Sequence, residues 1–547
     1  MGKVDGNDFR VKLQGLKTLL AGAGEIEQDL ETLARTLREQ YVESEAYPLS
    51  AVLADNLAAL GKIFAGSDDI RFREFWAAPL QLKATLVFLE GMVDEATINE
   101  HVIEKLTRPS AVPASGPQQS GLADTVRHTF LTTASVAVEN RMEAVVNRIL
   151  AGNAALFVDT LAAGIVVATR KVEARAIAEP DTEAEIRGPR DGFTEELRVN
   201  ITLIRRRIKN PNLVVGKRTV GRRSQTDIAV VYFRGIADFK LVGEVEKRLQ
   251  NITIDIPAPS GIHGLFEDSP FSIFPTVLDT ERPDRVVSLL AEGKVGILID
   301  GTPYCCVAPT TFTDFFKSGD DYYEKWLPAA LIRFTRYVTA FFALTMPALY
   351  VAITSFHPGL LPMPLTLTVG TSREGVPFPT FIEAFIMEGL LEIMQEAGIR
   401  LPKLIGPAVS IVGGLVIGEA AVRAGLVSPP LVIVTSFTAI ATFSISSYRM
   451  GLPLRLLRVP LMILAAGMGM FGVMWGLIAI AIHLSILESF GEPYLAPLTP
   501  RSSAHLSDLK DTVALLPATR MSERPAYLEP QDAVRLKEEK GSGDDAD

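Results

Sequence analysis

The sequence predicts an α/β region of two duplicated subdomains, followed by an α-helical membrane region with several spans. Charged residues are abundant up to about residue 326, whereas "YVTAFFALTMPALYVAITSF" (337–356) is uncharged and about 20 residues long. A helix of that length crosses the roughly 30 Å hydrocarbon core of a bilayer. The whole chain of 547 residues is 48% hydrophobic, with a net charge of -10. This composition is too apolar for an ordinary soluble protein.

An internal repeat predicts the duplication. Residues 149–169, "ILAGNAALFVDTLAAGIVVAT", match a second segment in which Asp300 takes the place of Asp159, an offset of 141 residues. Both copies read as a helix end, a glycine turn, an apolar strand, an Asp-led turn and a second strand. We expect subdomains at 67–189 and 190–326. The breaker-rich stretch 107–121 predicts a loop inside the first.

The α/β region carries none of the motifs that hold a nucleotide or a metal. Neither copy contains a phosphate-cradling glycine loop. Cys305 and Cys306 are the only cysteines. Neighbours in a strand point to opposite faces, so we expect no disulfide framework and no metal site here. We therefore predict no cofactor.

The two ends of the chain are interpreted as accessory parts. Residues 1–66 have helical spacing and mixed charge, which suits a solvated helical extension or a partner-binding helix. The first residues lack an apolar run with a small-residue cleavage site, so we expect the α/β region to face the cytoplasm. Residues 496–547 read as a cytoplasmic-type tail whose end is disordered.

An arginine- and glutamate-rich strip lies between the two copies. Its basic clusters raise nucleic acid as a partner, but the acidic overall balance and the lack of interleaved aromatic residues argue against it. Arginine forms bidentate pairs with carboxylates. We therefore predict an interdomain or intersubunit ionic strip with Arg187, Arg190 and Glu195 as its candidates.

The membrane region is predicted at 327–495 with four to five spans. Apolar candidates lie at 337–356, 404–424, 431–447 and 460–487, and the ambiguous fifth is the glutamate-bearing 376–397. Five spans place the basic clusters on the cytoplasmic side, as the positive-inside rule expects. Four spans instead return the charged tail to the cytoplasm. Both arrangements stay open.

Four carboxylates stand in the apolar stretch "FIEAFIMEGLLEIMQEAGIRLPKL": Glu383, Glu388, Glu392 and Glu396. At 100° per residue the last three share one helical stripe, and Glu383 lies opposite Glu388. Charges in lipid are costly, so the stripe faces water, a pore or basic groups. One interpretation is an interfacial helix paired with Arg373 and Arg400; the other is a cation-attracting pore.

Hydroxyl groups in the following span are candidates for the same path. The segment "TSFTAIATFSISSY" supplies Ser436, Thr438 and Thr442 among others. These side chains either line a hydrated ion path or form hydrogen bonds between helices. The sequence does not separate the two readings.

Several long segments carry a resemblance to a known family. "EPDTEAEIRGPRDGFTEELRVNITLIRRRIK", "TERPDRVVSLLAEGKVGILIDGTP", "DDYYEKW", "PALYVAITSFHPGLLP" and "DLKDT" resemble the A subunit of spore germinant receptors, the GerA family, which includes stage V sporulation protein AF. The similarity runs from about residue 70 to 525. The resemblance implies a multi-pass protein of the spore inner membrane. It further implies a homo-oligomeric ring, expected to be a pentamer, that acts with a transporter-like B subunit and a lipoprotein C subunit.

Two functions are compatible with these features. The first is a channel subunit that releases monovalent cations when nutrients are sensed. The second is a non-conducting scaffold or signal relay that couples a ligand-binding subunit to other spore membrane proteins. The sequence shows no Ser/His/Asp arrangement, HExxH motif or P-loop, so we do not expect an enzyme.

Overall fold

The computed structural model describes residues 48–535, except for 109–120, 134, 172–178, 181, 184, 186, 256–260, 401–417, 500–505 and 514. Most of the predicted extension 1–66, of the loop 107–121 and of the apolar candidate 404–424 therefore lies outside the described residues, as does the end of the tail. The chain divides into two compact units. The first comprises 1–176, 196–219 and 227–239, and the second comprises 177–195, 220–226 and 240–547.

The first unit is built on an antiparallel five-stranded sheet. Its strand order is β1-β2-β4-β5-β3. The strands are β1 (Ile70–Ala77), β2 (Leu82–Leu89), β3 (Val136–Glu139), β4 (Ala154–Val158) and β5 (Gly164–Val167). The helices are α2 (Leu53–Ile63), α3 (Glu95–Ile98), η2 (Asn99–Ile103), α4 (Glu104–Thr107), α5 (Leu122–Thr125), η3 (Val126–Phe130) and α6 (Met142–Leu150).

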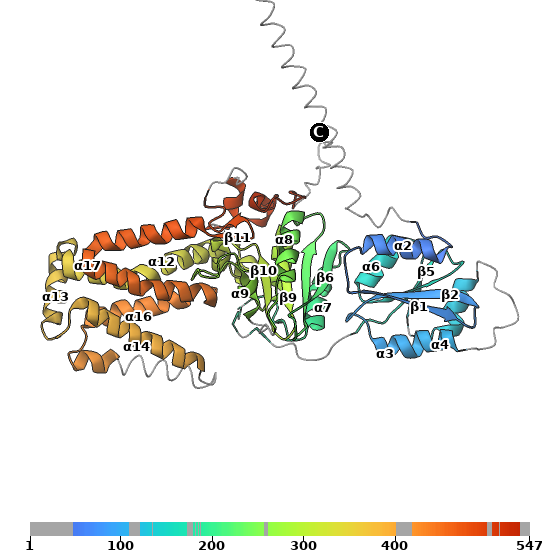
Figure 1. The fold of residues 1–547 in the computed structure, drawn as a ribbon, viewed down its shortest axis with the longest axis horizontal. Coiled ribbons are helices and arrows are strands. Elements are labelled where there is room, and N and C mark those ends of the chain that lie inside the picture. The colour runs from blue at the N-terminus through green and yellow to red at the C-terminus, as the bar shows by residue number, and fades with distance from the viewer. Residues whose placement is uncertain are drawn as a thin grey trace, which may run out of the picture. The chain divides into compact units, whose positions relative to one another are not determined.

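Alternation along the central strands places two cores on the two faces of this sheet. Val87 and Phe157 point to one face and pack against α2 and α6. Leu86 and Leu156 point to the other face and pack against the helices that follow β2. Successive strand residues point to opposite faces, so apolar residues at consecutive positions fill both cores. Figure 1 shows α2 and α6 on one side of the sheet and α3 and α4 on the other.

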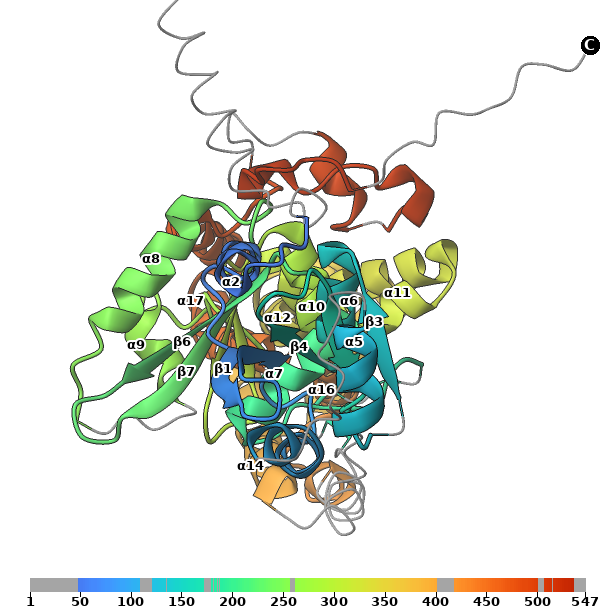
Figure 2. The ribbon, with the colours of Figure 1, turned by 90° about the vertical axis from the view of Figure 1, so that its right-hand side faces the viewer.

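A second five-stranded sheet repeats this topology. Its order is β6-β7-β9-β10-β8, which is the order of the first sheet strand for strand. Figure 2 shows β6 and β7 as a long hairpin. The elements are α7 (Leu197–Arg207), β6 (Leu213–Val220), β7 (Thr226–Phe233), α8 (Phe239–Gln250), α9 (His263–Phe266), β8 (Leu278–Thr280), α10 (Pro283–Glu292), β9 (Val295–Ile299) and β10 (Cys305–Ala308).

The repeat read from the sequence recurs in these elements. Val295 begins β9 and lies 141 residues after Ala154, which begins β4. Cys305 begins β10 and lies 141 residues after Gly164, which begins β5. The prediction of two sheet-containing regions is therefore confirmed, and the equal strand order is what a duplication predicts. Cys306 is buried in β10, and burial raises the pKa of its thiol.

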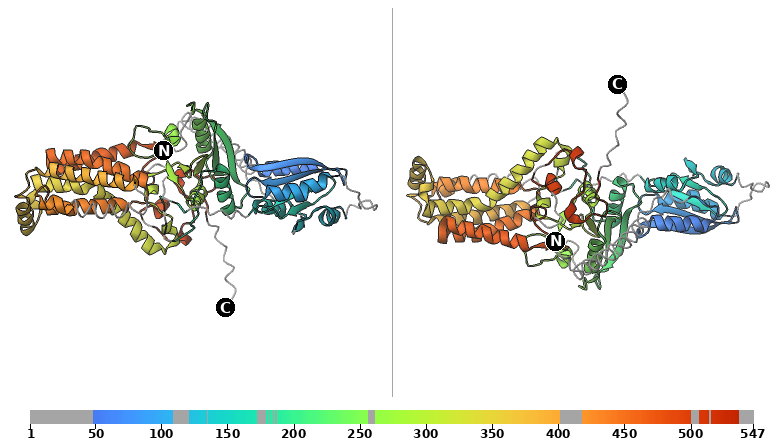
Figure 3. Two further views of the ribbon diagram at one scale, coloured as in Figure 1. Left: turned by 90° about the horizontal axis from the view of Figure 1, so that it is seen from below. Right: turned by 90° about the horizontal axis from the view of Figure 1, so that it is seen from above.

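The apolar helices lie in the second unit, together with β8, β9 and β10, whereas α7 and most of β6 and β7 belong to the first unit. After the short helices η5 (Phe312–Phe316) and α11 (Asp320–Tyr323) come α12 (Trp326–Phe356), η6 (Pro358–Leu360), α13 (Met363–Arg373), α14 (Thr380–Arg400), α16 (Pro429–Phe443) and α17 (Tyr448–Ile486). By length and composition, α12 and α17 are able to cross a membrane, and α16 is a shorter apolar helix. Figures 1 and 3 show the long helices side by side.

Helix α17 is a hairpin of two arms that turn at Gly469. This residue has non-helical backbone angles, φ 60° and ψ -139°. A side chain on Gly476 would collide with Leu461, which in one continuous helix would be about 22 Å away. The sequence predicted one span over 460–487, and the structure differs because the chain reverses inside it. Figure 1 shows the two arms.

The helical region has two ends, which we call the near end and the far end. At the near end, Ser446 donates to the carbonyl of Phe315, Arg449 pairs with Asp279, and His483 contacts Ser272. Both arms of α17 therefore meet the sheet-containing part of this unit at the near end. At the far end, Gly469 lies against Phe356 at the end of α12.

The residues after α17 complete the second unit. They form β11 (Glu488–Ser489), β12 (Glu492–Pro493), η7 (Leu506–Lys510), η8 (Ala518–Arg520) and η9 (Ala526–Leu528). The hydroxyl of Ser489 in β11 donates to the carbonyl of Thr276, two residues before β8. This bond fixes the β11–β12 hairpin beside the start of β8. The tail thus returns to the near end.

Candidate functional site in the helical region

The carboxylate of Glu388 on α14 lies 3.1 Å from the guanidinium of Arg458 on α17, and both side chains are buried. Arg458 also donates from Nε to the carbonyl of Ala343 on α12, at 2.7 Å, and from Nη2 to the hydroxyl of Thr442 on α16. One buried cation therefore joins four helices. An ionised group in such surroundings costs several kcal/mol unless it is paired and hydrogen-bonded. Arg458 and Glu388 supply that pairing to each other.

A second ion pair lies one helical turn away. Glu392 accepts from Arg455 at 3.0 Å, and Arg455 also donates to the side-chain oxygen of Gln395. The side chain of Glu392 is 54% exposed, in contrast to that of Glu388. Positions four apart on α14 and three apart on α17 face each other, which is the spacing that aligns side chains along two helices. Two ion pairs therefore connect α14 with α17, and the pair that contains Glu392 is the more exposed of the two.

Glu383 serves a different contact on the opposite face of α14. Its carboxylate is buried and accepts from both the backbone N–H and the hydroxyl of Ser428, the residue that precedes α16. Arg373 lies 3.4 Å from the other oxygen. A carboxylate at a helix N-terminus satisfies free N–H groups and complements the helix dipole. Glu383 thus holds the start of α16 against α14. Glu396, the fourth predicted carboxylate, is exposed.

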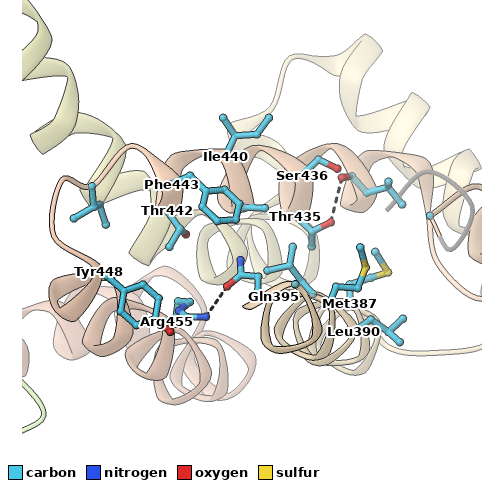
Figure 4. Close-up of a pocket in the computed structure, with 18 of the residues that line it drawn as sticks. Met387, Leu390, Gln395, Thr435, Ser436, Ile440, Thr442, Phe443, Tyr448 and Arg455 are labelled. Carbon is cyan, nitrogen blue, oxygen red and sulfur yellow. Dashed lines mark hydrogen bonds between the residues drawn. The ribbon is translucent and has the colours of Figure 1, made fainter. Parts of the chain in front are cut away.

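A cavity of about 700 Å³ lies between α14, α16 and the start of α17 (Figure 4). Most of its lining is apolar, with a few polar groups that include Arg455 and Gln395. The lining residues labelled in Figure 4 are Met387, Leu390, Gln395, Thr435, Ser436, Ile440, Thr442, Phe443, Tyr448 and Arg455. A mainly apolar cavity with few convergent polar groups is typical of ligand pockets.

The predicted hydroxyl residues do not act alike. Ser436 and Thr442 line the cavity. Thr438 is buried, and its hydroxyl donates to the carbonyl of Val434 at 2.8 Å. Thr442 donates to the carbonyl of Thr438 while it accepts from Arg458. A hydroxyl that donates to a carbonyl of its own helix has its hydrogen bond satisfied within that helix. Among the three, Thr442 is the one that joins a charged network.

The arginine-rich strip forms contacts within the chain. Arg187 pairs with Glu324 at 3.0 Å, and its backbone N–H donates to Asp320. Arg190 lies 3.8 Å from Glu179 and is 78% exposed. The backbone carbonyl of Glu195 accepts from the N–H of Gly301. The three predicted residues therefore contact different parts of the chain. The side chain of Arg190 is more exposed than that of Arg187.

The segment beside this strip is anchored by buried charges. Glu185 pairs with Arg282 at 2.7 Å, and Arg282 also pairs with Asp284. The hydroxyl of Tyr323 donates to Asp284 at 3.1 Å. Burial raises the pKa of Glu185 to about 7, although Arg282 acts to lower it. The carboxyl of Glu185 therefore titrates near neutral pH.

A second buried charge cluster was not predicted from the sequence. Arg333 at the start of α12 pairs with Asp321 at 3.0 Å and with Asp511 of the tail at 2.7 Å. Lys317 lies 3.6 Å from Asp511 and 3.3 Å from Asp314. Burial acts to raise the pKa of Asp314, but nearby lysines outweigh it and hold the pKa below its usual range. The segments "DDYYEKW" and "DLKDT" meet here. Their acidic residues were the feature of the sequence from which this cluster could have been predicted.

These residues offer no metal site. In the parts of the chain that the structure describes, no group of three or more His, Cys, Asp or Glu side chains is arranged to hold a metal ion. The charges of the helical region instead form pairs. The second unit therefore contains a bundle of apolar helices that ion pairs hold together, and in the sequence this bundle follows the two sheet-containing regions.

Comparison with known proteins gives the family. The model of the family described as "GerA: Bacillus/Clostridium GerA spore germination protein" matches residues 58–527. The chain is 40% identical over 484 residues to Spore germination protein B1 of Bacillus subtilis (strain 168), which covers 88% of this chain and 98% of that protein. It is 41% identical over 489 residues to Spore germination protein KA of the same organism, with 89% of this chain and 88% of that protein covered. The chain belongs to the GerA family, which confirms the resemblance seen in its sequence.

Two further proteins are similar to this chain. One is the uncharacterized membrane protein YfkQ of Bacillus subtilis (strain 168), which is 40% identical over 493 residues, with 90% of this chain and 94% of that protein covered. The other is a crystal structure of the N-terminal domain of the A subunit of the Bacillus megaterium spore germinant receptor GerK3. It is 29% identical, has a TM-score of 0.38, and covers 49% of this chain and 98% of that one.

Proposed function

We propose that the chain is a membrane subunit of a spore germination receptor complex, and that it assembles into a ring that conducts monovalent cations. Membership of the GerA family supports the germination role. The observation that carries the channel is the half-exposed carboxylate of Glu392, which pairs with Arg455 and still reaches the outside of the helix bundle. A ring of such carboxylates, one from each subunit, concentrates cations at the axis.

The bundle is proposed to cross the membrane with its near end at the cytoplasm. The first arm of α17, 448–468, is about 32 Å long at 1.5 Å per residue, which matches a hydrocarbon core of about 30 Å. Arg333, Arg336 and Arg449 stand at the near end, in agreement with the positive-inside rule. Because α17 turns at Gly469, its second arm returns the tail to the same side as the α/β region.

The contacts divide the four glutamates into two groups. Glu383 and Glu388 are buried and bonded inside one chain, so we assign them to holding the helices together. Glu392 and Glu396 are exposed, and we assign the ion path to them. Thr442 supports the first group through Arg458, and Ser436 faces the cavity.

The proposed partners are those that the resemblance to the family implies. We propose a homo-oligomeric ring, with a pentamer expected, in the inner membrane of the spore, together with a transporter-like B subunit and a lipoprotein C subunit. The exposed guanidinium of Arg190 is the candidate for pairing between subunits, since its contact with Glu179 is long and solvated. Arg187 and Glu195 make their contacts within one chain, so we assign them to its internal packing.

A non-conducting scaffold or signal relay is the second candidate. The observation that favours it is the buried cluster in which Arg333 of α12 is held by Asp321 and by Asp511 of the tail. Such a cluster joins the α/β region, a membrane helix and the tail rigidly enough to transmit a movement.

Flux measurements separate the two candidates. Purified full-length protein in liposomes that hold a potassium- or sodium-sensitive dye would show cation release for a channel. A folded, oligomeric protein that gives no flux would favour the scaffold. Addition of the B and C subunits then tests whether their presence is needed for opening.

A further inference from the structure

A short loop of the α/β region presents a fully exposed aromatic residue beside the end of α17. The side chain of Phe271 is 100% exposed, and that of its neighbour Ile273 is partly exposed. The backbone N–H of Ser272 donates to the carbonyl of Ser269, which closes a turn with Phe271 inside it. An isolated exposed apolar residue on a protein surface is common, so its position decides its meaning.

Two contacts to one histidine fix the position of this loop. The hydroxyl of Ser272 lies 3.0 Å from Nε2 of His483, and the ring of Phe274 lies 5.9 Å from the ring of His483. Ser272 also accepts from the backbone N–H of Phe274 at 3.1 Å. The loop is therefore packed against the second arm of α17, and Phe271 is next to the residue that makes the contact.

The level of Phe271 along the helix follows from this contact. His483 stands three residues before Ile486, the last residue of α17, and three residues span about 4.5 Å along a helix axis. Phe271 directly precedes Ser272, whose hydroxyl makes this contact, and adjacent Cα atoms are about 3.8 Å apart, so Phe271 lies close to that level. The headgroup layer on each side of a hydrocarbon core is about 5–7 Å thick. If α17 spans the membrane, Phe271 lies in this layer.

Other side chains at the near end have the composition expected of that layer. Partly exposed aromatic residues stand at the starts of α12 and α17 and on α11; they are Tyr322, Tyr323, Trp326 and Tyr448. Tryptophan and tyrosine are enriched where membrane helices meet the headgroups. On the second arm, Ile482 and Ile486, which lie one and three residues from His483 in the sequence, are exposed. The near end thus carries an aromatic and apolar rim.

The acidic residues next to the loop do not oppose a lipid surface. Asp268 pairs with Arg248 at 2.6 Å and also accepts from the backbone N–H of Phe490. Asp279 pairs with Arg449. Their charges are compensated inside the protein, so repulsion of anionic headgroups is weak.

We propose that the loop 269–273 is a membrane-surface anchor, with Phe271 inserted among the lipid headgroups at the near end. The proposal rests on the proposed membrane crossing of α17. Its effect is to hold the second sheet-containing region at a fixed height on the bilayer surface. The occupant of this surface is the lipid layer, and a second copy of the chain is the competing occupant that the test distinguishes.

Site-specific fluorescence tests the anchor in the full-length protein. The variant Phe271→Cys, labelled with a polarity-sensitive bimane, is placed in vesicles of phosphatidylcholine and phosphatidylglycerol with or without nitroxide-labelled lipids. Cys305 and Cys306 are buried, so the wild-type protein serves as the unlabelled control. Ile463→Cys, an exposed position within the first arm, reports the span itself. Ser224→Cys lies in the turn after β6, at the opposite edge of the sheet from β8.

The anchor predicts blue-shifted, lipid-quenched emission for Phe271→Cys and for Ile463→Cys, and neither effect for Ser224→Cys. Emission from Phe271→Cys that matches Ser224→Cys, with Ile463→Cys quenched, would overturn the anchor and leave the membrane crossing in place. Emission that is blue-shifted in detergent oligomers and insensitive to nitroxide lipids would show that a second copy covers Phe271, which also overturns it. An unquenched Ile463→Cys would remove the membrane crossing itself.

Discussion

The carboxylate of Glu388 and the guanidinium of Arg458 form an ion pair at 3.1 Å in the interior of the helix bundle, although 70 residues separate them in the sequence. The pair leaves little charge exposed, because Arg458 is also bonded to the carbonyl of Ala343 and the hydroxyl of Thr442. Removal of either partner would leave the other charge buried. The first prediction follows from the cost of leaving one of these charges buried without its partner.

Arg458→Ala is expected to destabilise the helical region by about 3–5 kcal/mol, because it leaves Glu388 buried without its partner. The double variant Arg458→Met with Glu388→Leu is expected to recover much of the loss, since both charges are then absent. Thermal unfolding in detergent, followed by loss of the monodisperse peak, measures both. Equal midpoints for Arg458→Ala and the wild type would contradict a structural role for the pair.

The tail is expected to depend on Asp511. Replacement of Asp511 by Ala removes one contact from Arg333 and one from Lys317, so residues 506–535 should detach and become sensitive to trypsin at Lys510 and Arg520. Loss of a buried charged partner costs roughly 1–3 kcal/mol. Asp532→Ala is the matched control, because Asp532 pairs with Arg524 at the surface. Identical digestion of the two variants would argue against the cluster as the tail's anchor.

Stability should depend on pH through Glu185. The pKa of this carboxyl is raised from 4.5 to about 7 in the folded protein, so between these values the folded state binds more protons than the unfolded state. Stability contributed by this group is therefore greatest at low pH and falls as the pH rises from about 4.5 to 7. One proton corresponds to a slope of at most about 1.4 kcal/mol per pH unit.

Glu185→Gln tests that dependence. Its unfolding midpoint, measured between pH 5 and pH 8, should decline less with rising pH than that of the wild type, because the glutamine cannot titrate. Gln also retains a hydrogen-bond acceptor for Arg282. Parallel curves for the two proteins would show that the titration of Glu185 is not coupled to folding.

Charge reversal at Arg190 is expected to weaken oligomers and leave the isolated chain folded. Its long, exposed contact with Glu179 is worth about 0–1 kcal/mol, so Arg190→Glu has little to disturb inside one chain. Crosslinking in vesicles measures the oligomer, and restoration by the opposite reversal at a partner carboxylate would identify the pair. An unchanged crosslinking pattern would place Arg190 outside the subunit interface.

Local patterns in the sequence were sufficient for the parts of the fold that are short-range. Consecutive residues determine the Asp-led turns at Asp159 and Asp300 and the apolar strands around them. The same is true of the long apolar helix 337–356. The turn at Gly469 was not predictable, because "GMGMFGVMWG" is equally compatible with one closely packed helix. The two arms become visible only in the structure, from the backbone angles of Gly469 and from the close approach of Gly476 to Leu461.

The candidate site shows the same division. Helical spacing placed Glu388 and Glu392 on one stripe and Glu383 opposite, and the structure gives them different neighbours accordingly. Which carboxylate is buried depends on Arg455 and Arg458, which approach α14 only after the chain has folded. The same holds for Arg333 and Asp511, because 178 residues separate them.

Cation flux through Glu392→Gln vesicles tests the central claim most directly. The substitution keeps the shape of the side chain and a hydrogen-bond acceptor for Arg455 while it removes the charge, so the protein should still fold and keep its oligomer size. Glu419→Gln, another exposed glutamate of the helical region that pairs with Arg423, is the matched control. Loss of roughly 1 kcal/mol of attraction predicts a fall in potassium and sodium flux of about fivefold for Glu392→Gln, with normal flux for Glu419→Gln. Flux equal to the wild type in intact Glu392→Gln oligomers would contradict an ion path that passes this carboxylate.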